Sequence, residues 1–367
     1  MAVTNKIKFF NQEKTTESVT TSASFTLQGT ILDADKLTAN NRYVMVSWIN
    51  CKSPGTNDGG SKLSFEGGAG DITGSVQQRH DTNSVGMAVS HIGEFVAPDP
   101  PENIGIYRKR VAGSAEEETA YGQCFAIDLS FSGDSGSLQD GTNYSSSTTT
   151  STRTEAPGGV FHSHTVNHGG SNLILASAKV FDNTDTALIG LYLDTVLIAS
   201  GSRFTQDPAD IKEVVFAVAQ NITAGQKVEI KNIDNDVVNA DYTYVFALNL
   251  DSSPAASETG KMTSWTDYGS SGSWGSKVMD GNAQPSFIVA MGRQTNAGIA
   301  SGRPAGVSLR NNTAGEWMLF NSRPSGDFSP LYFPATNYGQ DTGQKETSVI
   351  VGVGTISDTG EIELVTI

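Results

Sequence analysis

The sequence predicts an all-β protein made of three tandem antiparallel β-sandwich domains. Three observations lead to this prediction: helical periodicity is nearly absent, short apolar runs recur between turn-forming residues, and similar pairs of runs return three times along the chain. Short runs bounded by Gly, Asn, Asp and Pro are typical of strands. Many such strands joined by turns favour a sandwich or barrel over a sheet with crossover helices.

The expected strands follow one another at short intervals along the chain. Apolar and β-branched residues dominate each of them, and alternation of apolar and polar residues is visible in several. In chain order they are expected at 24–27, 43–48, 85–89, 104–107, 124–131, 173–180, 187–193, 214–218, 227–230, 244–250, 287–291, 316–320, 348–353 and 361–365.

A repeated pattern sets the expected domain boundaries. Opening strands begin near residues 43, 173 and 287, and closing strands begin near residues 124, 244 and 348. Any one similar pair could arise by chance, but three pairs in the same order indicate an internal repeat. We therefore expect domains at 1–140, 141–260 and 261–367. The polar stretch 133–159, which contains a Ser/Thr tract at 145–152, has the composition of a linker.

Composition excludes several classes of protein. The 367 residues carry a net charge of −15, which argues against a broad basic face for nucleic acid. No run reaches the ~18 apolar residues of a membrane-spanning helix, and no apolar segment of a signal peptide is evident at the start. Cys51 and Cys124 cannot make a disulfide framework, which fits folding in a reducing compartment, and we expect both to be buried apolar side chains.

No catalytic apparatus is evident. The run Gly133-Asp134-Ser135-Gly136 resembles the nucleophile motif of chymotrypsin-like proteases, but neither His80 nor His91 lies in the required Ala-His-Cys context. A glycine-rich turn is the simpler interpretation. The acidic run 116–118 is interpreted as a solvated loop, because paired catalytic carboxylates need a set separation. We therefore expect a protein that is not an enzyme.

The histidines at 162, 164 and 168 are the densest group of metal-type ligands. His162 and His164 would point to the same side of a strand, so both could reach one ion. Trimeric phage tail-tip proteins hold iron through such pairs around a three-fold axis, and this segment is similar to them at those two positions only. Solvated histidines on an edge strand are the alternative that we favour. We expect no metal and no cofactor.

Two acidic loops are candidate calcium sites. Residues 182–185 and 234–236 supply Asp and Asn oxygens, but neither loop has the Gly and Glu of an EF-hand. Turns that end strands are the interpretation we favour, and a weak ion site is the alternative.

Three aromatic residues in a Gly/Ser-rich loop are predicted to be interface anchors. Trp265, Tyr268 and Trp274 have few aliphatic neighbours in sequence, and large aromatics are enriched at contact hot spots. A glycan platform is the alternative. Trp48 and Trp317 fall in apolar strands and are expected in cores.

The segments SNLILASAKVF, ALIGLYLD, KEVVFAVAQNITAGQKVEI and YTYVFALNL carry a resemblance to a known class. Their pattern, extended over residues 20–357, resembles the tandem jelly-roll or related β-sandwich modules of tailed-phage virion proteins. Such proteins decorate capsids, form head fibres, or build tail and collar parts. The resemblance supplies no site residues.

The resemblance implies a non-enzymatic virion component, most simply a capsid decoration or head-fibre protein. Its expected partners are copies of itself, with a trimer as one form, and other virion proteins such as the major capsid protein. Neither nucleic acid nor membrane is expected as a partner, and assembly would take place in the host cytoplasm. The alternatives are a tail-associated receptor- or glycan-binding protein and, ranked lower, a glycan-cleaving virion enzyme.

Overall fold

The computed structural model describes most of the first 249 residues and only strand backbones beyond them. Side chains are described only within residues 18–249. The described ranges are 9–14, 18–52, 57–81, 87–111, 113, 117–130, 132–133, 136–138, 140–181, 186–204, 211–249, 273–279, 284–295, 305–311, 316–317, 335–336, 345–356 and 360–366.

The described secondary structure confirms the all-β prediction. Within those ranges the only helical element is one 3₁₀ turn, η1 (Ala34–Lys36), and the sheets are antiparallel. No helix in the same ranges is both long and apolar enough to cross a membrane.

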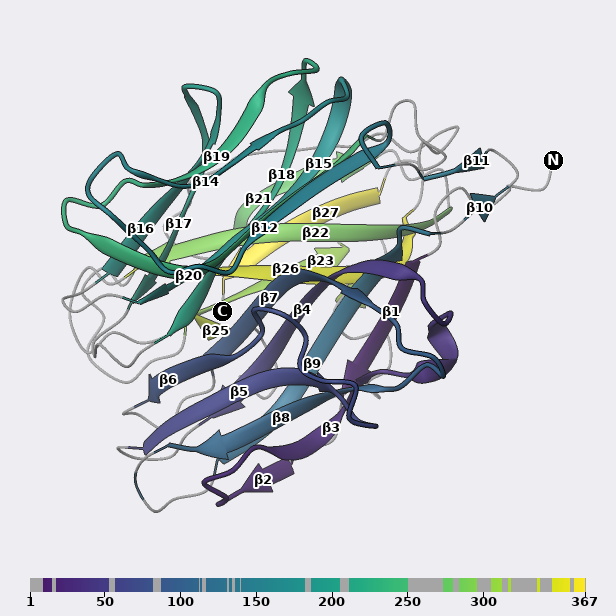
Figure 1. The fold of residues 1–367 in the computed structure, drawn as a ribbon, viewed down its shortest axis with the longest axis vertical. Coiled ribbons are helices and arrows are strands. Elements are labelled where there is room, and N and C mark those ends of the chain that lie inside the picture. Colours follow the sequence, from purple (N-terminus) through teal and green to yellow (C-terminus); the bar gives the residue numbers. More distant parts are fainter. Residues whose placement is uncertain are drawn as a thin grey trace.

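The first sandwich packs a five-stranded sheet against a four-stranded sheet (Figure 1). The five-stranded sheet has the order β1-β9-β4-β7, with β2 also paired to β9, and the four-stranded sheet has the order β3-β8-β5-β6. The strands are β1 (Phe9–Lys14), β2 (Ser18–Thr20), β3 (Thr26–Leu32), β4 (Arg42–Lys52), β5 (Asn57–Phe65), β6 (Gln77–Asp81), β7 (Met87–Val96), β8 (Ile104–Arg110) and β9 (Glu117–Asp128).

The second sandwich follows a short hairpin, β10 (Ser132–Gly133) and β11 (Gly136–Ser137). Its five-stranded sheet has the order β12-β20-β15-β18, with β13 also paired to β20, and its four-stranded sheet has the order β14-β19-β16-β17. The strands are β12 (Tyr144–Thr149), β13 (Arg153–Glu155), β14 (Val160–Thr165), β15 (Gly170–Phe181), β16 (Thr186–Leu193), β17 (Val196–Phe204), β18 (Lys212–Ile222), β19 (Lys227–Asn232) and β20 (Val238–Asn249).

Both sandwiches have the same jelly-roll-like strand order. Adding eleven to each strand number of the first sandwich gives the second, including the short strand that pairs off the main path. Without the short strand off the path, each sandwich has eight strands, four in each sheet. The chain passes back and forth between these two sheets, which is the arrangement of a jelly roll. The opening strand also pairs directly with the closing strand in both, as β4 with β9 and as β15 with β20.

A third group of strands follows at the C-terminal end. A sheet of order β21-β27-β23-β24, with β25 also paired to β23, lies beside the two-stranded sheet β22-β26. The strands are β21 (Ser273–Met279), β22 (Gln284–Thr295), β23 (Ala305–Asn311), β24 (Glu316–Trp317), β25 (Ala335–Thr336), β26 (Lys345–Ile356) and β27 (Gly360–Thr366). Here too the expected opening strand, β22, pairs with the expected closing strand, β26.

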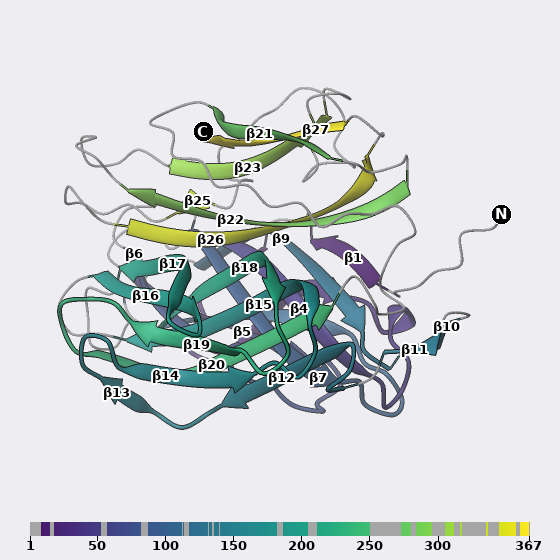
Figure 2. The same cartoon turned by 90° about the horizontal axis from the view of Figure 1, so that it is seen from above.

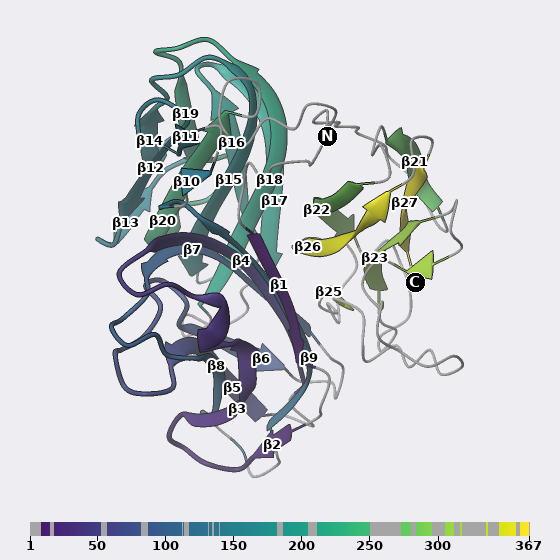
Figure 3. The same ribbon diagram turned by 90° about the vertical axis from the view of Figure 1, so that its right-hand side faces the viewer.

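The β22–β26 pair lies across both sandwiches (Figures 2 and 3). β26 lies next to β4, β7 and β9 of the first sandwich and next to β17 and β18 of the second. The predicted domain boundaries near 140 and 260 stay predictions.

The five-stranded sheets are buried on both faces. In β4, Tyr43 and Met45 belong to the core of the first sandwich, while Val44 and Trp48 point the other way and are just as buried. In β20, Val245 belongs to the core of the second sandwich, while Tyr244 and Phe246 lie on the opposite face of the sheet and are also buried. These strands therefore read as continuous apolar runs, since neither face meets water.

The Ser/Thr tract is a strand, so the linker interpretation of 133–159 is wrong over this part. Residues 144–149 form β12, which pairs with β20 from Tyr144 opposite Leu248 to Thr149 opposite Thr243. A linker composition is misleading here because the hydroxyl groups of β12 have imidazole partners inside the sandwich.

Replacing Phe246 by Ala should lower the free energy of unfolding by ~3–5 kcal/mol, because the ring is fully buried and contacts Tyr144. Chemical denaturation measures the loss. Val237, which is 49% exposed, gives the control, since its change to Ala should cost less than ~0.5 kcal/mol. A cost below ~1 kcal/mol for Phe246→Ala would mean that the outer face of β20 is not packed.

Candidate functional site

The best-defined polar site lies where the second sandwich meets the free edge of β7. Strand β7 is the last strand of its sheet, and an edge strand presents unpaired backbone N–H and C=O groups. At Ile92 these groups are taken up by side chains of the second sandwich. The Ile92 N–H donates to Glu213 Oε1 at 3.2 Å, and the Ile92 carbonyl accepts from Tyr242 Oη at 3.2 Å and from Ser177 Oγ at 3.3 Å. We call this set the inter-sandwich joint.

Glu213 is the centre of the joint. Its side chain is 0% exposed, and Oε2 lies 2.7 Å from Nδ1 of His91. Gln77 of β6 contacts Glu213 twice, since Nε2 lies 3.4 Å from Oε2 and Oε1 accepts from the Glu213 N–H at 3.2 Å. The Glu213 carbonyl accepts from Nε of Arg203 at 2.8 Å. The carboxylate itself contacts His91, Gln77 Nε2 and the Ile92 N–H, and a buried carboxylate needs several such partners to offset its lost hydration.

Two tyrosines of β20 complete the contact with β7. Burial, followed by the charges of Glu213 and Glu94, raises the pKa of Tyr242 well above its usual value. Burial and the Glu94 carboxylate raise the pKa of Tyr244 in the same way. Both hydroxyls therefore stay protonated and donate, Tyr244 to Glu94 at 2.8 Å. Gly74, at φ 76°, lies directly against the Tyr242 ring, where a β-carbon would collide with it.

A backbone bridge adds to the joint. Gln78 of β6 and Ile211 exchange both N–H···O=C hydrogen bonds at 3.0 Å. Strand β6 is also an edge strand. Ile211, directly before β18, therefore pairs with the edge of the first sandwich. The two sandwiches are therefore joined by main chain as well as by side chains.

Sequence reasoning missed the joint. Glu213 stands at the start of the apolar run KEVVFAVA, and a carboxylate in a strand buried on both faces needs a partner. That local signal was available. The identity of the partner was not, because His91 lies 122 positions away in sequence.

Replacing Glu213 by Ala should cost ~3–5 kcal/mol of unfolding free energy, since it leaves His91, Gln77 and the Ile92 N–H without their common partner. Denaturant titration of the intact chain measures this. Asp35→Ala is the control, because both side chains of its pair with Lys36 at 3.2 Å are exposed and the pair should be worth under ~1 kcal/mol. Equal losses of unfolding free energy in the two variants would show that the buried contacts of Glu213 stabilise the chain no more than an exposed ion pair does.

The histidines form a second polar cluster, inside the second sandwich. β14 is an edge strand as expected, but His162 is only 7% exposed and not solvated. Its Nε2 lies 2.7 Å from Ser147 Oγ and its Nδ1 lies 2.9 Å from Thr149 Oγ1. His164 Nε2 lies 2.9 Å from Ser145 Oγ. These contacts connect β14 to β12, so they close the open side between the two sheets.

The hydrogen bonds fit neutral imidazole rings. Burial, then the charges of His164 and Arg153, lowers the pKa of His162 to about 4. Burial likewise lowers the pKa of His164 and of His168. Both nitrogens of His162 are engaged by hydroxyls, so neither is free for a metal ion. Within the described residues, no group of three or more His, Cys, Asp or Glu side chains is placed to hold one.

Stability of the second sandwich should fall as the pH drops from about 6.5 toward about 4. The folded pKa of His162 lies below the unfolded value, so the unfolded chain binds the proton more readily across this window. Thermal melting from pH 7.5 to 4.5 measures the trend. His162→Gln should flatten it relative to the parent chain. An unchanged slope in this variant would remove His162 as its cause.

The remaining candidates have ordinary structural roles or lie outside the described residues. Residues 134 and 135 of the Gly-Asp-Ser-Gly run lie outside the described residues, between the paired strands β10 and β11, so the turn interpretation stays a prediction. In the 234–236 loop, Asp234 Oδ2 accepts from the Leu188 N–H at 2.9 Å, while 182–185 lie outside the description. Cys51 and Cys124 are buried thiols, as predicted, and Cys124 Sγ donates to the Ile31 carbonyl at 3.0 Å.

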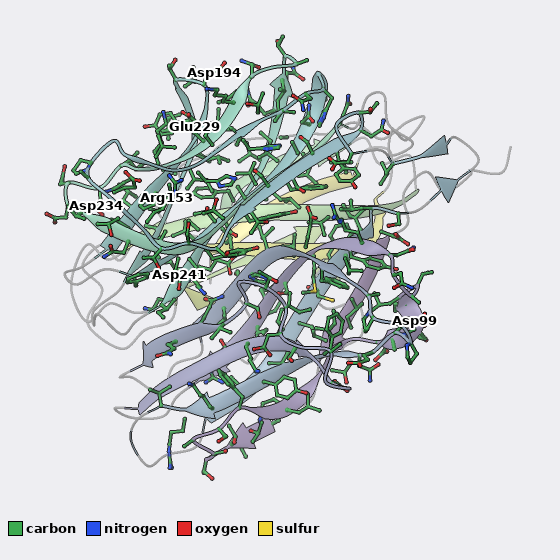
Figure 4. The ribbon with its side chains drawn as sticks, viewed as in Figure 1. Asp99, Arg153, Asp194, Glu229, Asp234 and Asp241 are labelled. Atoms are coloured by element: carbon green, nitrogen blue, oxygen red, sulfur yellow. The ribbon has the colours of Figure 1, made fainter. Side chains whose placement is uncertain are left out.

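The predicted interface anchors cannot be placed by side chain. Trp265 and Tyr268 lie outside the described residues, and Trp274 lies in β21, of which the backbone alone is described. Their role stays a prediction. Figure 4 shows other charged side chains, including Asp194, Arg153 and Asp234, on the outward side of the second sandwich.

Comparison with known sequences gives no family. No family model matches the chain, and no curated protein matches it.

Solved structures resemble the chain only distantly, as β-sandwich or jelly-roll proteins. Eiger TNF from S. frugiperda is 13% identical with a TM-score of 0.25, over 33% of this chain and 99% of its own. The tandem CBM22 domain of Paenibacillus barcinonensis Xyn10C is 10% identical with a TM-score of 0.21, over 65% and 92%. The major capsid protein P2 of bacteriophage PM2 is 6% identical with a TM-score of 0.21, over 65% and 97%. The strand order of the described residues shows β-sandwiches, and these comparisons show no family.

Proposed function

We propose that the chain is a non-enzymatic structural component of a phage virion, as a capsid decoration or head-fibre protein. The inter-sandwich joint is the observation that carries this proposal. Buried hydrogen bonds at Ile92 and Glu213, and the backbone bridge between Gln78 and Ile211, hold two jelly-roll-like sandwiches directly against each other. A part of a shell or fibre has to keep its shape under load, and a buried joint of this kind favours that role.

The proposal includes the finer architecture. We infer that three tandem domains arose from one internal repeat, which the shared strand order of the first two sandwiches supports. Copies of the chain and other virion proteins, such as the major capsid protein, are the proposed partners, after assembly in the host cytoplasm. Jelly rolls occur in viral capsid proteins and in lectins, so the fold alone does not separate the virion role from glycan binding.

Low-resolution imaging of intact virions tests the function. Copies of the chain, marked by antibody, should follow the shell lattice or a fibre. A few copies at one vertex would favour the alternative of a tail-associated receptor- or glycan-binding protein. Release of sugars from polysaccharide incubated with the chain would favour the glycan-cleaving enzyme, and absence of the chain from virions would overturn the virion proposal.

Changing Trp265 and Trp274 together to Ala should weaken incorporation into the particle more than tenfold, or about 1.4 kcal/mol per copy. The melting temperature should stay the same, because the pair is proposed to contact a partner rather than a core. Quantifying the chain in purified particles measures incorporation. Unfolding of the isolated double mutant would instead assign these residues to the chain's own core.

A further inference from the structure

Strand β12 is an edge strand of the second sandwich. It pairs with β20 on one side, and no described strand pairs with it on the other. Figures 2 and 3 show β12 on the side of the second sandwich that faces away from the β22–β26 pair. An edge strand presents main-chain N–H and C=O groups to which a further strand can be added. The outer edge of β12 is therefore a place where a strand from another molecule can pair.

The main-chain groups of β12 point alternately toward β20 and away from it. The Asn143 carbonyl accepts from an N–H of β20 at 2.8 Å, so every second residue after it bonds to β20 and the residues between point outward. The Tyr144 carbonyl points outward, as this alternation requires, and accepts from the Gly141 N–H at 2.7 Å. Within the described part of the chain, the outward main-chain groups of Ser146 and Thr148 form no hydrogen bond.

The other edges of the two sandwiches are each protected. β7 and β6 contact the second sandwich at Ile92 and Gln78, and β17 and β18 lie next to β26. Register shifts interrupt β3 and β14, and β1 ends in the charged residues Glu13 and Lys14. Coverage, bulges and charges are the usual means of protecting an edge. β12 has none of these, because its register with β20 is regular and residues 144–152 contain neither a charged residue nor a proline.

The composition of β12 favours a second β12 as the partner strand. Thr148 is exposed and Ser146 is half-buried, and paired Ser and Thr side chains on neighbouring strands can hydrogen-bond to each other. Two copies placed antiparallel about Ser147 bring Ser146 opposite Thr148 of the second copy, on both sides of a two-fold axis. Both residues point their main-chain groups outward, so each such pair can exchange both of its N–H···O=C bonds.

We propose that a second copy of the chain adds its β12 to this edge, so that two five-stranded sheets join into one continuous sheet. This contact gives a surface to the self-association included in the proposed function, but it rests on the edge itself and not on a virion role. Small side chains bury little area, so the contact belongs to the weak class below ~1,200 Å². The net charge of −15 opposes the approach of two copies, and salt that screens this repulsion should strengthen the pairing.

Sedimentation equilibrium of the intact chain from about 5 to about 500 μM tests the pairing. The mass should rise from monomer toward dimer as the concentration increases. Raising the salt from about 0.05 to about 0.5 M should lower the dissociation constant about two- to tenfold. A monomer at every concentration overturns the proposal. A dimer that salt weakens also overturns it, because that result indicates a contact between opposite charges.

Two variants of Thr148 locate the contact. Thr148→Pro removes an outward N–H but none of the N–H groups that bond to β20, and Thr148→Lys places a charge on the edge. Each should weaken the dimer at least fivefold. Thr223→Lys puts the same charge on an exposed turn and should leave the dimer unchanged, with a melting temperature equal to that of Thr148→Lys. An unchanged dimer in Thr148→Lys, or an equal loss in Thr223→Lys, overturns the proposal even where Thr148→Pro fails to fold.

Hydrogen exchange resolved to single amides gives an independent readout. The amides of Ser147 and Thr149, which point toward β20, should exchange slowly at every concentration. Those of Ser146 and Thr148 should become slow only as the dimer forms. Slow exchange of Ser146 and Thr148 at the lowest concentration would mean that the chain covers its own edge, and would overturn the proposal. All these measurements use the isolated chain, so absence of the chain from virions would overturn the proposed function and leave the β12 contact standing.

Discussion

The free edge of β7 at Ile92 is the constraint on which the arrangement of the two sandwiches depends. An edge strand with unpaired backbone groups is a template for aggregation unless something covers it. Here the cover is made of the side chains of Glu213, Tyr242 and Ser177 rather than another strand. Because these side chains come from three strands of one sheet, the edge fixes where that sheet can lie.

Burial of both faces of the five-stranded sheets follows from this arrangement. Val44 and Trp48 on one sheet, and Tyr244 and Phe246 on the other, would be exposed in isolated sandwiches, yet each is at most 1% exposed. At ~25 cal/mol per Å² of apolar surface, such burial stabilises the assembled chain. The hydrogen bonds at the joint select the geometry, while the apolar surface supplies most of the stabilisation.

The all-β class was predictable because strand signals are local, whereas the polar sites depend on distant partners. Runs such as YTYVFALNL indicated a buried strand, and β4–β9 and β15–β20 pair as the opening and closing strands suggested. Composition misled at β12, whose serines and threonines pair with His162 and His164. The reason is physical: the hydroxyls that mark a linker in sequence are satisfied by imidazoles that only the fold brings near. The His91–Glu213 contact is non-local in the same way.

Hydrogen exchange of the intact chain tests the joint most directly. The amides of Ile92, Gln78 and Ile211 all donate across the boundary between the sandwiches. If the two sandwiches form one body, peptides that contain these amides should exchange as slowly as peptides from the centre of β15, through global unfolding alone. Exchange at these three amides that is much faster than in β15, while both sandwich cores stay protected, would contradict the account.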